Sequence, residues 1–251
     1  MSSIKLISLN IEMSKHLDAV TAFLEKERAD VVCVQELFEH DIPRIESAIQ
    51  SSSYCFAPMS RHRYVQPSPI MGVAIFSTLP MKESSVQLYS GNPSEIPDFD
   101  WDDPSTYQNK NHSLVRCDVG SEGATFSIGT THFTWTPNGK PDAVQRRDIR
   151  SLLLLLSQQK EFVLCGDFNA PRGGEIWGRI AAKYKDNIPA EYRTSIDINL
   201  HRAGKERSHE LADKMVDGLF TTSGYTASDV RLEFGVSDHA AIVATVSRLS
   251  D

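Results

Sequence analysis

Residues with catalytic or metal-binding side chains follow several apolar segments of this 251-residue chain, at the points where those segments end. Carboxylate and amide oxygens are the ligands that a hard divalent cation prefers, and an imidazole exchanges protons near neutral pH. A single residue of this kind is usually a turn or a helix cap, but five such places in one chain favour a shared site. The residues are Asn10, Glu36, His132, Asp167 with Asn169, and Asp238 with His239.

The segments that precede these residues have the patterns of strands and helices. Residues 4–11 alternate apolar and polar side chains, residues 31–34 form an apolar run typical of a buried strand, and residues 16–28 have helical spacing. The ends of strands are where α/β folds present ligand sites, because loops there lie over a rigid scaffold. Further strands are expected at 72–76, 113–119, 124–133, 161–165, 215–221, 227–232 and 239–247, and further helices at 41–50, 141–158 and 175–183.

Two polar stretches, residues 81–111 and 200–209, fall outside these patterns, and we expect both to be connections. The first is acidic and the second is basic, so a polyanion would follow the second and avoid the first. Trp101 and Trp135 have side chains that could stack on a base, although tryptophan is more often a packing residue. The acidic residues are Glu95, Asp98, Asp100, Asp102 and Asp103, and the basic residues are His201, Arg202, Lys205, Arg207 and His209.

The composition is that of an ordinary globular protein, with 40% hydrophobic and 24% charged residues, which excludes a disordered or fibrous chain. The net charge of −7 gives no overall positive field to hold long nucleic acid. The longest apolar stretch, residues 152–156, is too short to cross a bilayer, and the four cysteines form no CxxC pair. We therefore expect a cytoplasmic protein with no stable membrane association, and the sequence leaves its oligomeric state open.

The same residues carry a resemblance to a known family. Leu9-Asn10-Ile11, Val34-Gln35-Glu36, Thr131-His132-Phe133, Gly166-Asp167-Phe168-Asn169 and Ser237-Asp238-His239 occur in the order typical of the endonuclease/exonuclease/phosphatase superfamily. The resemblance extends from residue 4 to residue 247. It implies an α/β fold, a four-layer α/β sandwich of two packed mixed β-sheets flanked by helices, with the site at one end of the sheets. Because no linker or repeat interrupts the pattern, we expect one domain over residues 1–251.

For the metal, the resemblance implies that Glu36 is the principal ligand of Mg²⁺, with Mn²⁺ as a possible substitute. Asn10 would add an amide oxygen, and Asp238 would contribute a carboxylate from the far strand. A hard cation suits this chemistry, since it neutralises the anionic phosphodiester and activates water. The family roles of Asp167 and Asn169 are to orient the attacking water and to hold the phosphate.

The histidines complete the implied site. His239 would act as the general base or as the imidazole that polarises the phosphate, and Asp217, in the segment MVDGLF, would orient it. His132 would contact a phosphate oxygen or assist the leaving group. The apurinic-endonuclease subgroup normally has Tyr where this chain has His132, which argues against that subgroup.

The resulting functional hypothesis is a Mg²⁺-dependent phosphodiester hydrolase acting on nucleic acid, as a nuclease or as a DNA-end-processing phosphodiesterase. An alternative on the same scaffold is a phosphatase or phospholipase-type hydrolase of a small or lipid phosphate. A third hypothesis, a non-catalytic binding module, predicts the loss of a ligand or of the base. The chain keeps all of these residues, which disfavours the third hypothesis.

Overall fold

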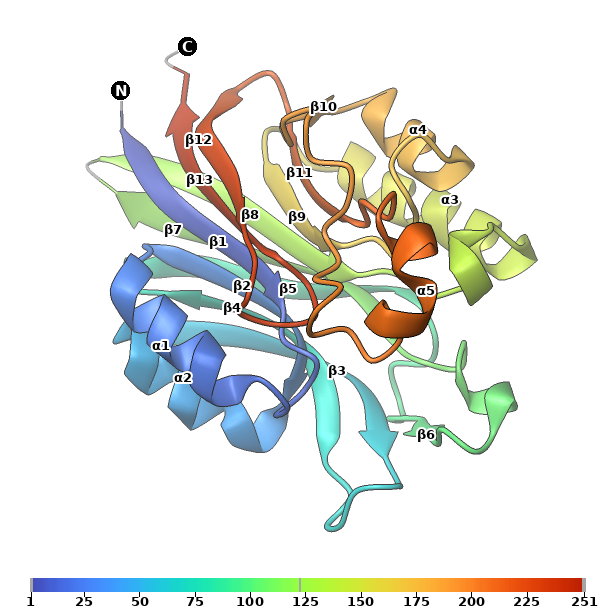
Figure 1. The fold of residues 1–251 in the computed structure, drawn as a ribbon. Coiled ribbons are helices and arrows are strands. Elements are labelled where there is room, and N and C mark those ends of the chain that lie inside the picture. Colours follow the sequence, from blue (N-terminus) through green and yellow to red (C-terminus); the bar gives the residue numbers. More distant parts are fainter. Residues whose placement is uncertain (1, 122, 250–251) are drawn as a thin grey trace.

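The computed structural model describes residues 2–121 and 123–249, and within them two β-sheets pack face to face (Figure 1). The first sheet has seven strands, in the order β12 (Tyr225–Glu233), β13 (Ala241–Arg248), β1 (Ser3–Asn10), β2 (Val31–Phe38), β4 (Ile70–Ser77), β3 (Ser53–His62) and β6 (Asp98–Phe99). The second has six, in the order β10 (Lys185–Asp186), β11 (Asp217–Thr221), β9 (Val163–Asp167), β8 (Ala124–His132), β7 (His112–Ser121) and β5 (Met81–Ser90).

Both sheets are mixed. In the first sheet β1 pairs with β2, and β3 with β6, in parallel, while the other neighbours are antiparallel. In the second sheet only the β8–β9 pair is parallel among the described strands. The α-helices are α1 (Leu17–Glu27), α2 (Ile42–Ile49), α3 (Ala143–Ser157), α4 (Glu175–Ala181) and α5 (Gly204–Leu211), and the short 3₁₀ helices are η1 (Glu39–Asp41), η2 (Pro104–Thr106) and η3 (Pro137–Gly139).

The alternation of side chains along the strands creates two hydrophobic layers. In β1, Leu6 faces the second sheet, whereas Ile7 belongs to the cluster formed with α1 and α2. The helices α3 and α4 cover the outer side of the second sheet, where Leu152 and Trp177 are buried (Figure 1). The order of layers is therefore helices, sheet, sheet, helices, which confirms the four-layer α/β sandwich expected from the sequence.

Several elements differ from the sequence-based expectation. The stretch 81–111 is not a plain connection, because β5 occupies its first part and β6 and η2 its middle. The stretch 200–209 contains most of α5. The strands β3 and β10 were not expected either. No helix within the described ranges combines the length and the apolar character needed to cross a membrane.

Candidate active site

A cavity of about 600 Å³ opens at the end of the two sheets where the predicted site residues converge. Six of those residues line it directly: Glu36, His132, Asp167, Asn169, Asp238 and His239. The other two, Asn10 and Asp217, lie behind this surface and are 2% and 3% exposed. The sequence therefore identified a set of residues that meet in space although they are separated by up to 229 positions along the chain, from Asn10 to His239.

Strand alternation explains why three of these side chains face one another. In β1, Asn10 points to the same side as Leu6, into the space between the sheets. In β9, Asp167 follows Cys165 on the side that faces the first sheet, and in β8 His132 follows Thr130 in the same way. The ends of β1, β8 and β9 thus bring an amide, an imidazole and a carboxylate to one edge.

Glu36 reaches the cavity because of an irregularity in its strand. Regular alternation would place its side chain with Val32 and Val34 on the face covered by helices. However, the pairing of β2 with β4 shifts register between Val34 and Leu37, and Glu36 has a φ of 56°. This β-bulge redirects the Glu36 carboxylate, and its Oε1 lies 3.5 Å from His132 Nε2. A left-handed backbone at a non-glycine residue is costly, and such strain is concentrated at functional sites.

Asp167 is held by contacts on both of its carboxylate oxygens. Asn10 Nδ2 donates to Oδ2 at 3.0 Å, and the backbone N–H of Asn169 donates to Oδ1 at 2.8 Å. The Nε2 atom of His132 lies 3.5 Å from Oδ2. Burial raises the pKa of Asp167, but the contact with His132 and the charge of His239 outweigh it, so that its pKa falls to about 2. Asp167 is therefore ionised at neutral pH.

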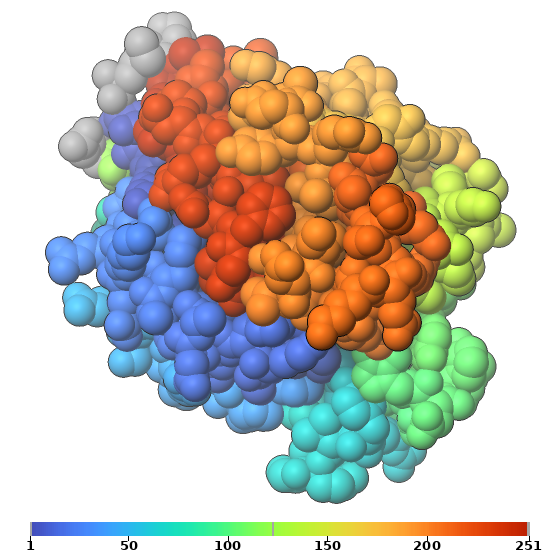
Figure 2. Space-filling view, in the orientation of Figure 1, coloured from blue at the N-terminus to red at the C-terminus, as the bar shows by residue number. Residues whose placement is uncertain are grey.

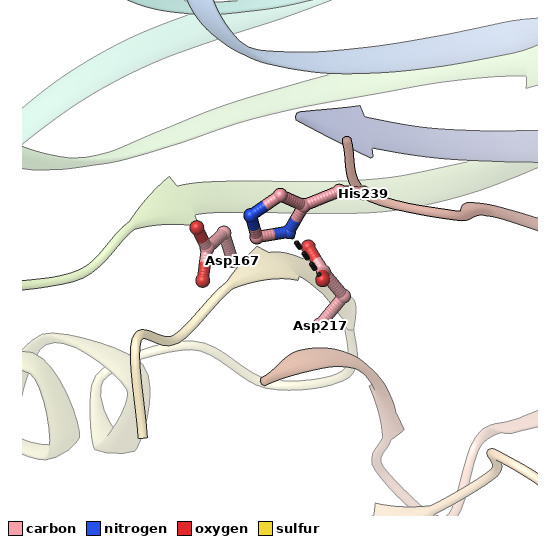
Figure 3. A group of neighbouring side chains, drawn as sticks. All are labelled: Asp167, Asp217 and His239. Carbon is pink, nitrogen blue, oxygen red and sulfur yellow. Dashed lines mark hydrogen bonds and ion pairs between the residues drawn. The ribbon is translucent and has the colours of Figure 1, made fainter. Parts of the chain in front are cut away.

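Asp217 and His239 form a hydrogen-bonded pair in which Nδ1 donates to Oδ2 at 2.7 Å (Figure 3). Asp217 begins β11, directly opposite Asp167 in the antiparallel pair with β9. Its backbone N–H, like that of Val216, donates to the buried hydroxyl of Ser195 at 3.1 Å, which fixes the start of the strand. Ser195 has no signal in the sequence, because only the fold brings it beside Asp217.

The imidazole of His239 lies beside two carboxylates, as Figure 3 shows. Burial lowers its pKa, but the charges of Asp217 and Asp167 raise it well above the usual value. Potential ligand atoms of these three residues lie within 4.8 Å of one another. Because Nδ1 is already bonded to Asp217, Nε2 is the ring nitrogen left available to a ligand in the cavity.

Asp238, Glu12 and Glu36 form a second acidic group that lines the cavity and suits a hard divalent cation. Burial raises the pKa of Asp238 to about 7, and the nearby charges of Glu12 and Glu36 contribute to this shift. Together these three carboxylates offer the oxygen-rich donor set that a hard divalent cation binds. The amide oxygen of Asn10 accepts from the Glu12 backbone N–H at 3.1 Å, so one of its lone pairs is already used.

Glu12 and Lys110 are charged residues of the cavity lining that the sequence did not predict. Glu12 follows Asn10 by two positions, and its carboxylate contacts Lys15 and His16 at 2.9 and 3.0 Å. Lys110 lies two residues before β7 with its ammonium 4.1 Å from the ring centroid of Phe99, and it makes no ion pair with any described residue. A position just after the first strand was an available signal for Glu12, whereas nothing marked Lys110.

Solved structures share this fold over nearly the whole chain. An endonuclease/exonuclease/phosphatase from Beutenbergia cavernae matches with a TM-score of 0.73 at 16% identity, covering 100% of this chain and 72% of that chain. One from Bacteroides vulgatus matches with a TM-score of 0.72 at 15% identity, covering 99% and 100%. The human Nocturnin catalytic domain, solved with a bound sulfate anion, matches with a TM-score of 0.69 at 14% identity, covering 98% and 94%. Identities this low show the fold alone.

Comparison at the level of sequence families is more specific. No curated protein sequence matches the chain. The model of the Endonuclease/Exonuclease/phosphatase family matches residues 7–239, which include every residue of the candidate site. Enzymes of this family hydrolyse phosphoester bonds and generally depend on a divalent metal. The chain therefore belongs to the endonuclease/exonuclease/phosphatase family and is a phosphoester hydrolase.

Proposed function

We propose that this enzyme is a Mg²⁺-dependent phosphodiesterase that cleaves nucleic acid, as a nuclease or an end-processing enzyme. The observation that carries the proposal is the arrangement of charge around one cavity. One part of the cavity is lined by the carboxylates of Glu36, Asp167 and Asp238 and by His132 and His239, and we call it the catalytic floor. Basic side chains line the rest of the cavity: Lys110, Arg202, Arg207 and Lys214. A phosphodiester chain needs both, a cation at the reacting phosphate and basic groups for the phosphates on either side.

Glu36 and Asp238 would hold the metal, with the remaining lone pair of the Asn10 amide oxygen as a third ligand. When bound there, Mg²⁺ would neutralise charge on the phosphate and lower the pKa of water, and Mn²⁺ would substitute for it. The proposed ligands are all oxygens, which is the donor set that Mg²⁺ requires. The contact of His132 Nε2 with Glu36 Oε1 at 3.5 Å would keep the main carboxylate in place.

The remaining residues have distinct proposed roles. Asp167 and Asn169 would orient the attacking water, since Asn169 Nδ2 donates to the Phe133 carbonyl at 3.0 Å and leaves its Oδ1 free to accept. His239, held by Asp217, would donate from Nε2 to a phosphate oxygen, because the two flanking carboxylates favour its charged form. His132 would contact a second phosphate oxygen. Hydrolysis breaks one P–O ester bond, and water supplies a hydroxyl to phosphorus and a proton to the leaving oxygen.

A substrate panel tests the proposal directly. Single- and double-stranded DNA, RNA, phosphotyrosyl-DNA and small phosphate esters would be assayed with Mg²⁺, with Mn²⁺ and with a chelator. We expect cleavage of a nucleic acid that the chelator abolishes and Mg²⁺ restores. His239→Ala should lower the rate of cleavage by about 10²–10⁴-fold, whereas His40→Ala, at an exposed histidine outside the cavity, should leave it unchanged. Turnover of small or lipid phosphates alone would replace nucleic acid with the alternative substrate class.

A further inference from the structure

Four aromatic side chains form one side of the cavity, and we call this set the aromatic wall. Its members are Phe99, Trp101, Tyr107 and Trp135, all of which line the cavity. Neighbouring rings contact edge to face: Phe99 and Trp101 have centroids 4.8 Å apart, Trp101 and Tyr107 5.8 Å, and Tyr107 and Trp135 5.9 Å. The contacts are continuous from β6 to the segment that follows His132. Trp135, at that end of the aromatic wall, is three residues from His132 of the catalytic floor.

The aromatic wall is a built feature rather than a loose loop. The strand β6 adds to the edge of the first sheet, where Phe99 pairs with His62 of β3. The next turn is closed by Thr106, whose hydroxyl donates to the carbonyl of Asp100 at 3.0 Å and accepts from its N–H at 3.1 Å. In this frame Trp101 and Trp135 remain 38% and 40% exposed. Partly exposed aromatic rings inside a cavity are surfaces on which a flat ligand can stack.

Cations of the protein already occupy positions over this wall. The guanidinium of Arg202 lies 4.4 Å from the ring centroid of Trp101, and the ammonium of Lys110 lies 4.1 Å from that of Phe99. In Figure 2 the orange segment around α5 and the green segment near residue 100 adjoin on the same face. A ligand with its own cationic head would meet like charge here. An anionic ligand with a flat neutral ring would find both a stacking surface and a counter-charge.

We infer that the aromatic wall is a stacking subsite for an unpaired nucleobase beside the scissile phosphate, so that the substrate is single-stranded or locally unpaired. The inference rests on the proposed function and narrows it. A base in the interior of a duplex has neighbours on both faces, so it cannot stack on Trp101 or Trp135 without leaving the helix. A cavity of about 600 Å³ also suits one or two nucleotides and is too small to enclose a double helix.

Binding measurements on the full chain test the subsite separately from turnover. An intact single-stranded oligonucleotide, the same strand with an abasic position beside the cleaved bond, and the matched duplex would be titrated with Ca²⁺ in place of Mg²⁺, a change meant to slow turnover. We expect the intact strand to bind about tenfold more tightly than the abasic strand, within the range of one stacked base. Trp101→Leu with Trp135→Leu should remove that difference, and the Phe substitutions should retain most of it. Tyr54→Leu, at an exposed aromatic outside the cavity, is the matched control.

The outcomes separate this inference from the proposed function. Equal affinity for intact and abasic strands, or an unchanged preference in the Leu variants, would overturn the stacking subsite even if nucleic acid is cleaved. Tighter binding of the duplex would overturn it as well. An effect of the Leu variants on a phosphotyrosyl-oligonucleotide alone would assign the wall to an aromatic leaving group instead. Absence of nucleic-acid cleavage in the substrate panel would remove the proposed function itself.

Discussion

At the scale of single residues, the site is organised around carboxylates that the fold forces together. Asp167 and Asp217 lie directly opposite each other in the β9–β11 pair, a placement that is unfavourable for two like charges. His239 is the compensating group, because it bonds to Asp217 and lies beside Asp167. Asn10 contributes a second compensation through its donation to Asp167. His239 and Asn10 thus offset the repulsion between the carboxylates of Asp167 and Asp217.

Glu36→Gln tests the metal ligand. The change keeps the shape of the side chain and removes its charge, so affinity for Mg²⁺ should fall more than stability does. Loss of a residue that only holds a metal ligand in place already weakens metal binding by ~10–100-fold. Loss of the ligand's own charge should therefore raise the dissociation constant for Mg²⁺ by at least that factor. Isothermal titration calorimetry with Mg²⁺ measures this directly. Glu39→Gln, at an exposed carboxylate outside the cavity, should bind as the wild type does. Unchanged Mg²⁺ affinity in Glu36→Gln would show that another group holds the cation.

Asp217 and His239 should act as one unit. His239→Ala should lower kcat by about 10²–10⁴-fold, the usual range for a positioned acid or base, and Asp217→Asn should lower it by less. Because Asp217 acts through the imidazole, the double variant should be little slower than His239→Ala alone. Steady-state kinetics of the two single variants and the double variant complete the cycle. Rate losses that multiply would contradict the pairing.

At the scale of elements, the sequence predicted the buried strands and helices well, because their apolar periodicity is set by the core. Strands β1, β2, β4 and β9 are buried apolar segments, and α1 and α3 show helical spacing. The strand β5 was missed because it lies at the edge of its sheet and because its first half carries exposed polar residues at 82–84. A strand of this kind is defined by its partner rather than by its own pattern.

The candidate site shows the same division. The sequence showed the types of the site residues and their positions after strands. It could not show the bulge that turns Glu36 into the cavity, because that bulge depends on the pairing of β2 with β4. Trp101 and Trp135 lie 34 positions apart, and only the placement of β6 on the edge of the first sheet brings them to one wall. Contacts of this type depend on tertiary structure and leave no local signature.

Asp142 links the start of helix α3 to the segment around Gln108 and should contribute to stability. Its Oδ1 accepts from the N–H of Gln145 at 2.8 Å as an N-cap, and its Oδ2 accepts from Gln108 Nε2 at 2.7 Å. Asp142→Ala should lower the free energy of unfolding by about 1 kcal/mol, the usual effect of losing such a cap. Urea denaturation measures it, with Asp102→Ala, at an exposed carboxylate, as the control.

The contribution of Asp142 should also depend on pH. Burial raises its pKa, but the hydrogen bonds from Gln108 and from the backbone of Gln145 bring it below the usual value of 3.8. A carboxyl whose pKa is lowered in the folded state stabilises the protein above its unfolded pKa, and this stabilisation disappears as the pH falls through the folded pKa. The difference in stability between wild type and Asp142→Asn should therefore be constant near neutral pH and shrink below pH 3.8. A difference that stayed constant down to acid pH would exclude this role.

At the scale of the whole molecule, a net charge of −7 coexists with a basic side of the cavity. The sequence predicted that a polyanion would follow the basic stretch and avoid the acidic one, but the two stretches meet at the cavity, where the guanidinium of Arg202 lies 4.4 Å from the ring centroid of Trp101. Of the five basic residues of that stretch, His201, Arg202 and Arg207 line the cavity, whereas Lys205 and His209 are exposed outside it. Local placement of charge, rather than the overall sum, therefore decides where a polyanion can bind.

The two arginines should carry the salt dependence of substrate binding. Each contact with a phosphate releases counterions, and the slope of log affinity against log salt for a single strand is about 0.7 per contact. Arg202→Gln with Arg207→Gln should therefore raise KM for an oligonucleotide and reduce the magnitude of that slope by about 1.4. Lys205→Gln removes the same type of charge from the same segment and should leave the slope unchanged. Fluorescence anisotropy at several salt concentrations distinguishes the two. If all three charges contributed equally, they would act through the general field of the segment, and the placement of two of them in the cavity would have no special effect.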